Sequence, residues 1–175
     1  MTEIYTMPGH LIRRLQQISV SVFSDRMRAL GHDLTSPQFA ALAVLAHAPG
    51  IDQATLAGMI AHDRPTIGGV VERLEAKGLV TRHRNEKDRR AKVLGLTEAG
   101  RALHDRLLPD VRAIQTDILP GLTPEERTEF VRLAAKVAAA GNAHSRAPLV
   151  LPARPQGAAP VAQSTGTGPN RSSTA

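Results

Sequence analysis

The segment from Leu79 to Leu96 constrains the fold of this chain more than any other part of the sequence. It reads LVTRHRNEKDRRAKVLGL, with apolar residues at both ends and charged residues in the centre. Apolar residues that alternate with others, as Leu94 and Leu96 do, are typical of a β-strand, so the segment predicts a hairpin with a long polar tip. Six basic and two acidic residues lie between Arg82 and Lys92, and the whole chain has a net charge of +6. Most of the net charge is therefore concentrated in this hairpin.

A short helix, a tight turn and a longer helix are predicted directly before the hairpin. Asp52 is a favourable N-cap for a short helix over residues 53–60, which a three-residue turn follows. The longer helix covers residues 64–77, where apolar residues recur at helical spacing, and Gly78 occupies the position after a helix that favours glycine. This order of helix, turn, helix and basic hairpin predicts a winged helix-turn-helix over residues 35–97.

Longer helices are predicted on both sides of the winged helix. The first covers residues 8–30 and stops at Gly31. Inside the winged helix-turn-helix region, Ser36 is the expected N-cap of a second helix, with a proline at the next position. After the hairpin, Thr97 caps a further helix, in which Pro109 predicts a kink or a local break. The fold class is therefore expected to be mainly α, with a single β-hairpin.

The outer helices are expected to form a dimerisation unit. Thr123 and Glu126 form a capping box that opens the last helix. The helices over residues 8–30 and 98–142 carry more apolar surface than a small winged helix can cover, which favours pairing with a second copy. The alternative is that they close a bundle within one chain. The residues assigned to the dimer interface are Leu11, Leu15, Leu107, Val111, Ile114, Ile118, Phe130, Leu133 and Val137.

Composition excludes several classes of function. Hydrophobic residues make up 42% of the chain but only four are aromatic, which favours a helical core of Leu, Val, Ile and Ala. There is no cysteine, which excludes disulfides, thiolate metal sites and thiol-based redox sensing. The histidines lack metal-ligand spacing, and no phosphate loop, nucleophile elbow or HExxH motif is present, so no metal, cofactor or catalytic activity is expected.

Neither a membrane span nor a secretory signal is expected. No apolar run reaches the roughly 20 residues that cross a bilayer, and the N-terminus lacks the apolar stretch of a signal peptide. A cytoplasmic, nucleoid-associated protein without a membrane partner is therefore expected. Residues 145–175 are rich in Pro, Ala, Gly, Ser and Thr without an apolar period, so they are expected to form a disordered tail after a folded domain over residues 1–144.

The hairpin and the longer helix are expected to bind DNA together, because a basic finger suits the phosphate backbone and a narrow minor groove attracts arginine. The alternative is that the charges only protect an exposed sheet edge. On the helix, Arg64 and Thr66 lie where base edges and phosphates are contacted in a major groove, and Arg73 lies on the exposed face. Arg73 alternatively forms an ordinary surface ion pair. The candidate contacts in the hairpin are Arg82, Arg84, Lys87, Asp88, Arg89 and Arg90.

Two adjacent glycines lie in the middle of the longer helix. Gly68 and Gly69 each cost a helix about 1 kcal/mol relative to alanine. They either permit the backbone to approach DNA closely or allow close packing against the preceding helices. The sequence leaves both explanations open.

Two strings of residues resemble the multiple-antibiotic-resistance regulator (MarR) family. They are LAGMIAHDRPTIGGVVERLEAKGLVTR and, after it, DRRAKVLGLTEAG. The second matches the wing signature of that family, here Asp88, Arg90, Leu96, Thr97 and Gly100. The resemblance covers about residues 10–140 and implies a winged-helix homodimer on a pseudo-palindromic operator, with Arg90 in the minor groove and Asp88 orienting its guanidinium. Pro65, Gly68 and Gly69 depart from the usual pattern of the family, in which these positions more often carry Ser, Thr or charged residues. The departures affect which bases the helix reads, and not how it docks on DNA.

The resemblance also implies an inducer, often an aromatic acid, bound between the dimer helices and the winged helix. Within the family, the chain most resembles repressors of nicotinate degradation, whose inducer is a hydroxylated nicotinic acid such as 6-hydroxynicotinic acid. Arg14 can pair with a carboxylate through its planar guanidinium, and it lies in a polar stripe with His10 and Gln17. The alternative is that this stripe is simply the solvent-exposed face of the helix. Further candidate effector contacts are His32, Gln38 and His62. The alternative function is an architectural DNA-binding protein without an inducer.

Overall fold

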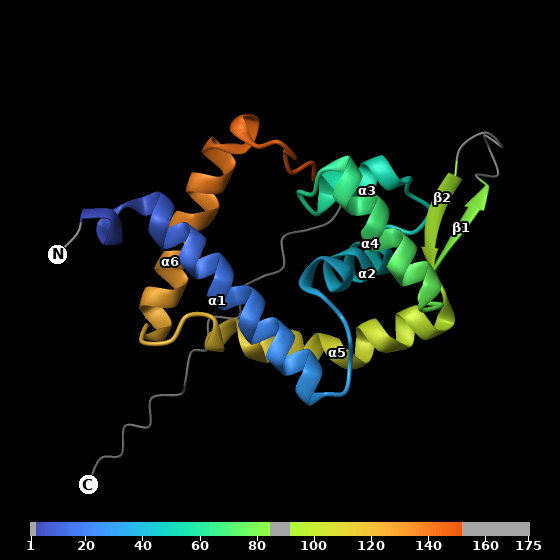
Figure 1. Ribbon diagram of the computed structural model, residues 1–175, viewed down its shortest axis with the longest axis horizontal. Helices are drawn as coiled ribbons and strands as arrows, with labels where there is room; N and C mark the ends of the chain where they lie inside the picture. Colours follow the sequence, from blue (N-terminus) through green and yellow to red (C-terminus); the bar gives the residue numbers. More distant parts are fainter. Residues whose placement is uncertain (1–2, 85–91, 152–175) are drawn as a thin grey trace, which may run out of the picture.

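The computed structural model describes residues 3–84 and 92–151. Within them the fold is mainly helical with one antiparallel hairpin, which confirms the predicted fold class. The hairpin projects at one end of the molecule and α6 lies at the other (Figure 1). The α-helices are α1 (Pro8–Ala29), α2 (Ser36–His47), α3 (Gln53–Met59), α4 (Arg64–Ala76), α5 (Glu98–Asp117) and α6 (Pro124–Ala140). The strands are β1 (Val80–Arg84) and β2 (Lys92–Leu96), and the 3-10 helices are η1 (Glu3–Thr6) and η2 (Asn142–His144).

The winged helix is built around a core of aliphatic side chains. β1 pairs with β2 so that Val80 lies opposite Leu96 and Arg84 opposite Lys92. Ile51, between α2 and α3, forms an isolated bridge with Leu94. The inner end of the hairpin is therefore joined to the helical core, whose fully buried side chains include Leu42, Leu45, Leu56, Ile67, Leu74 and Leu94.

Side-chain caps begin most of the helices. The predicted N-caps Asp52, Thr97 and Thr123 are confirmed, and each accepts a hydrogen bond from the backbone N–H three residues later. The predicted N-cap at Ser36 is wrong. Thr35 has the extended conformation of an N-cap, whereas Ser36 is already the first helical residue of α2. The capping box that α2 uses spans Thr35 and the third helical residue, which moves the helix start by one position.

The long helix α5 is continuous through Pro109, so of the two predicted alternatives the local break is wrong and the kink stays a prediction. Leu107 and Ile114 lie on either side of the proline and are 2% and 3% exposed. Both belong to the core that α5 forms with α1 and α2, and this burial offsets the backbone hydrogen bond that the proline removes. The assignment of these two residues to a dimer interface is also wrong, because they are already covered within one chain.

The first residues of the expected tail are docked on the protein. The side-chain amide of Asn142 donates to the carbonyl of Leu149 at 3.1 Å and accepts from its N–H at 2.7 Å. The N–H of Val150 donates to the carbonyl of Gly58 in α3 at 2.8 Å. Residues 145–151 therefore follow an ordered path from α6 to α3, and the expectation of a tail that is disordered from residue 145 onwards is wrong for this part. The rest of the predicted tail, residues 152–175, lies outside the described residues.

Candidate nucleic-acid interface and neighbouring cavities

The start of α4 is fixed by a cap. Asp63 has an extended conformation and its carboxylate accepts a hydrogen bond from the N–H of Thr66 at 2.8 Å. Hydrogen bonds from Thr66, first from its side chain and then from its backbone, hold the pKa of Asp63 below its usual value. The preceding turn contains Ala61 in the left-handed region, with φ of +51°. This turn and cap set the direction in which α4 leaves α3.

One face of α4 is open to solvent. Ile67, Val70, Val71 and Leu74 are buried in the core. Thr66, Gly69 and Arg73 lie at i, i+3 and i+7, which places them together on another face of the helix. Thr66 and Arg73 are exposed, and no residue in the described ranges forms an ion pair with Arg73. The alternative, that Arg73 forms an ordinary surface ion pair, therefore has no support in the described part of the chain.

The two glycines of α4 are not required by packing. A Cβ atom added to Gly69 would have no described atom within 4 Å, and one added to Gly68 would lie 3.6 Å from the side-chain amide of Gln53, an ordinary contact. The close-packing explanation therefore has no support among the described residues. The explanation that the glycines let the backbone approach DNA stays a prediction.

The base of the wing (the hairpin over residues 80–96) is tied to α4 by an ion pair. The Nε of Arg82 lies 2.9 Å from a carboxylate oxygen of Glu75, and both side chains are about 30% exposed. Arg84, two residues further along β1, is exposed. Arg82 was expected to contact DNA, but in this structure it faces α4. Glu75 was missed by the sequence analysis, since the pairing depends on how the strand returns past the helix end.

Several predicted DNA contacts lie outside the described residues. They are the wing-tip residues Lys87, Asp88, Arg89 and Arg90. The backbone of Arg64 begins α4 as expected, but its side chain is also outside the described part of the structure. These contacts remain predictions from the sequence and from the resemblance.

The predicted effector residues are not brought into one cavity. Arg14 and Gln17 are exposed on α1, and the ring of His10 packs edge-on against Tyr5. Gln38 is 2% exposed, and its side-chain oxygen accepts the N–H of Thr35 in the capping box. His62 lies in the α3–α4 turn, where its ring nitrogen is 3.1 Å from the carbonyl oxygen of Ile60.

One of the effector candidates, His32, lines a cavity formed by described residues. A polar depression of 470 Å³ lies between the end of α1 and the start of α2. The guanidinium of Arg106, from α5, lies 3.4 Å from the ring of His32. The depression is lined by Ser24, Arg28, Gly31, His32, Asp33, Leu34 and Thr35.

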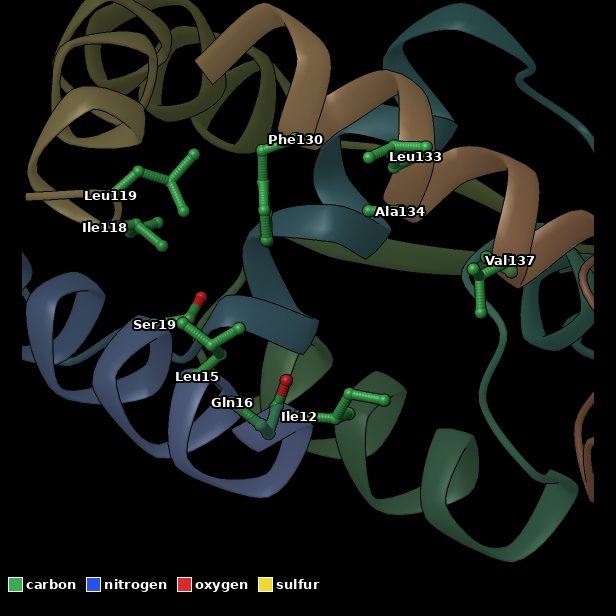
Figure 2. Close-up of a pocket in the computed structure, with 11 residues that line it drawn as sticks. Ile12, Leu15, Gln16, Ser19, Ile118, Leu119, Phe130, Leu133, Ala134 and Val137 are labelled. Atoms are coloured by element: carbon green, nitrogen blue, oxygen red, sulfur yellow. The ribbon is translucent and has the colours of Figure 1, made fainter. Parts of the chain in front are cut away.

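A larger apolar groove lies between α1, α6 and the end of α5. It has a volume of 570 Å³, and Figure 2 shows Phe130 of α6 pointing across it towards α1. No residue of α6 is buried, and Leu133 and Val137 are 46% and 65% exposed. Predicted interface residues that line the groove are Leu15, Ile118, Phe130, Leu133 and Val137. Leu11 is also exposed, whereas Val111 packs partly against the core.

The described part of the chain holds neither a metal-binding cluster nor a membrane-spanning helix. Residues 3–84 and 92–151 contain no cluster of three or more histidine and carboxylate side chains that could hold a metal ion. Within the same ranges, none of the helices combines the length and the apolar character needed to cross a bilayer.

The fold and its surfaces define a class of protein. The chain has a winged helix in which α4 presents an open face beside a basic hairpin, and α1, α5 and α6 extend away from it. This is the architecture of a DNA-binding transcription regulator. The chain belongs to the MarR family. The MarR family model matches residues 32–91. The transcriptional repressor NicR of Pseudomonas putida is 38% identical over 130 residues, which are 74% of this chain and 80% of NicR.

Solved structures of the family agree with this assignment. BpsR of Bordetella bronchiseptica, whose DNA binding is regulated by 6-hydroxynicotinic acid, superimposes with a TM-score of 0.70 and 32% identity over 75% of this chain and 93% of BpsR. PcaV of Streptomyces coelicolor, solved in complex with its natural ligand, gives a TM-score of 0.70 and 35% identity over 81% of this chain and 98% of PcaV. The family confirms the expectation of a DNA-binding regulator rather than an enzyme.

Proposed function

We propose that this chain is a homodimeric repressor that binds a pseudo-palindromic operator and leaves it when a small aromatic acid binds. The observation that carries the proposal is that one chain has both an open face on α4 and an uncovered apolar groove lined by α1, α6 and the end of α5. α6 lies at the end of the molecule away from the hairpin (Figure 1). A second copy covers the groove and presents a second α4 to the DNA. A repressor of this kind works on chromosomal DNA in the cytoplasm.

The dimer is supported by the state of α6. α6 has 17 residues, none of them buried, and its exposed leucine and valine side chains leave an apolar face open to water in a single chain. Two-fold pairing through α1, α5 and α6 buries these side chains. It also sets the two recognition helices about 34 Å apart, one turn of B-DNA.

DNA contact is supported by the charge and exposure of α4 and the wing. Arg73 and Arg84 are exposed cations on these neighbouring elements. Arg90, at the wing tip, is expected to enter the minor groove with Asp88 beside it, as the family resemblance implies. An aromatic acid as effector is supported by the similarity to BpsR, and 6-hydroxynicotinic acid is the first compound to test.

The dimer is tested by adding a charge to the groove. Leu133→Glu is expected to yield monomers in analytical ultracentrifugation, because a carboxylate cannot be buried without a partner. Thr128→Glu is the matched control, since Thr128 is exposed on the same helix and does not line the groove. A dimeric Leu133→Glu variant would contradict the proposed interface.

DNA binding is tested with an operator selected from a random duplex library. One protected palindrome in a footprint supports a specific repressor, whereas uniform coating supports the architectural alternative. Arg90→Ala is expected to weaken operator binding by about 1–3 kcal/mol while the dimer stays intact. Unchanged affinity at matched salt would remove the wing tip from the interface.

The effector is tested by thermal shift and by release of the operator. 6-Hydroxynicotinic acid is expected to raise the melting temperature and to weaken operator binding, because an inducer must favour the conformation that does not bind DNA. Arg14→Ala is expected to abolish the release but to keep DNA binding. Arg13→Ala is its control, as the neighbouring exposed arginine of α1. If Arg14→Ala responds normally, another residue holds the carboxylate.

A further inference from the structure

The ion pair between Arg82 and Glu75 joins the wing to the recognition helix. Glu75 is the penultimate residue of α4, and Arg82 is the third residue of β1. Between them the chain reverses at Gly78, whose φ is +67°, and passes through the buried residue Leu79. The 2.9 Å contact therefore spans the corner between the two elements that are to meet DNA.

No described ion pair lies further out along the wing. Val80 and Leu94 are buried and hold the inner end of the hairpin in the core. Beyond them His83, Arg84 and Lys92 are exposed, and no described ion pair joins them to the body. A two-stranded hairpin is marginally stable alone, so its angle depends on contacts at its base. At the level of Arg82 the hairpin has two described attachments: Leu94, the residue opposite Arg82, forms backbone hydrogen bonds with Gly50 and Ile51, and Arg82 pairs with Glu75. The Arg82–Glu75 pair is the described ion pair that ties this part of the wing to α4.

We infer that Arg82 is a positioning residue, which acts through Glu75 to hold the wing at a fixed angle to α4 rather than by contacting phosphate. The inference rests on the proposed DNA-binding function. A wing and a helix that enter different grooves bind well only when their relative angle is set before binding. The pair is about 30% exposed, so its contribution to folding stability is small, and its effect is expected in DNA affinity.

The sign of one substitution separates this role from direct phosphate contact. Glu75→Gln removes a negative charge beside the DNA surface. If Glu75 only competes with phosphate for Arg82, the substitution strengthens binding. If Glu75 holds Arg82 and the wing in place, the substitution weakens DNA binding even though it removes an unfavourable negative charge. We expect a loss of about fivefold to tenfold on the selected operator.

Glu72→Gln is the matched control. Glu72 lies on the same helix, is exposed, and has no ion-pair partner among residues 3–84 and 92–151. The same change of charge there is expected to leave affinity unchanged or to raise it. Equal effects of the two substitutions would overturn the inference.

The salt dependence of Arg82→Ala adds a second criterion. Loss of a phosphate contact lowers the slope of log K against log salt by about 1, whereas loss of a positioning residue lowers affinity and leaves the slope unchanged. The exchanged pair Glu75→Arg with Arg82→Glu is expected to recover part of the affinity that Arg82→Glu alone loses. A lower slope or no recovery would overturn the inference.

A measurement without DNA separates this inference from the proposed function. The chain has no cysteine, so spin labels can be attached at Glu72→Cys on α4 and Lys92→Cys on β2. Glu75→Gln and Arg82→Ala are expected to broaden the distance distribution between the labels, while circular dichroism stays unchanged. An unchanged distribution would overturn the positioning role even if DNA binds. Failure of the unsubstituted protein to bind any duplex would instead contradict the proposed function.

Discussion

Gly100, in the first turn of α5, lies directly against the backbone carbonyl of Leu79. A Cβ atom at Gly100 would lie 2.9 Å from the carbonyl carbon of Leu79, which leaves no room for a side chain. The same carbonyl accepts the N–H of Thr97, and the Thr97 hydroxyl donates to the carbonyl of Gly78. The Thr and Gly of the wing signature therefore join the end of α4 to the start of α5.

The first prediction is that Gly100→Ala destabilises the protein. The added methyl group must displace backbone, which costs about 1–3 kcal/mol in a packed interior. Urea denaturation measures the free energy of unfolding. Gly9→Ala is the control, because Gly9 is in α1 with no atom within 4 Å of an added Cβ, and it is expected to be neutral or stabilising. Equal stability of the two variants would show that the Leu79 contact relaxes without cost.

The second prediction concerns Gly69 on the open face of α4. Gly69→Ala is expected to stabilise the fold by about 0.5–1 kcal/mol, because alanine favours the helix and nothing described lies near the added methyl. It is expected to weaken operator binding at the same time, since the methyl group occupies space needed by DNA. Denaturation and gel-shift titration measure the two effects separately. An unchanged operator affinity would show that the glycine does not approach DNA.

The third prediction concerns the C-terminal residues. Truncation after Leu151 is expected to leave the melting temperature unchanged, because residues 152–175 have the composition of a disordered segment. Truncation after His144 is expected to lower stability by about 1 kcal/mol, since it removes the hydrogen bonds of Leu149 and Val150. Differential scanning calorimetry compares the two. If both truncations behave alike, residues 145–151 are not held on α3 in solution.

The fourth prediction is a pH dependence from the cap of α4. The folded-state pKa of Asp63 lies below the ordinary value of an aspartate because Thr66 donates hydrogen bonds to the carboxylate. The stability that the ionised form contributes is therefore present above the unfolded pKa and is lost as pH falls through the folded pKa. The melting temperature of Asp63→Asn is expected to lie below that of the unsubstituted protein near neutral pH, and the gap is expected to close in acid. A gap that does not change with pH would contradict this role.

The sequence determined the order of the elements, because their signals are local. Apolar residues at helical spacing, the caps at Asp52, Thr97 and Thr123, and the glycine at position 78 are readable without neighbours in space. The wing signature likewise predicted the family. The error at Ser36 is also local, since Thr35 and Ser36 are both good N-caps and only the backbone conformation selects one.

Tertiary structure decided which of these residues face each other. Periodicity could not distinguish the side of α5 that meets its own chain from a side left for a partner, so Leu107 and Ile114 were assigned to the wrong surface. The pairing of Arg82 with Glu75 and the docking of Val150 on Gly58 depend on how the chain returns past elements already folded. A sequence pattern records which residues repeat, whereas a contact between distant residues depends on the path of the whole backbone between them.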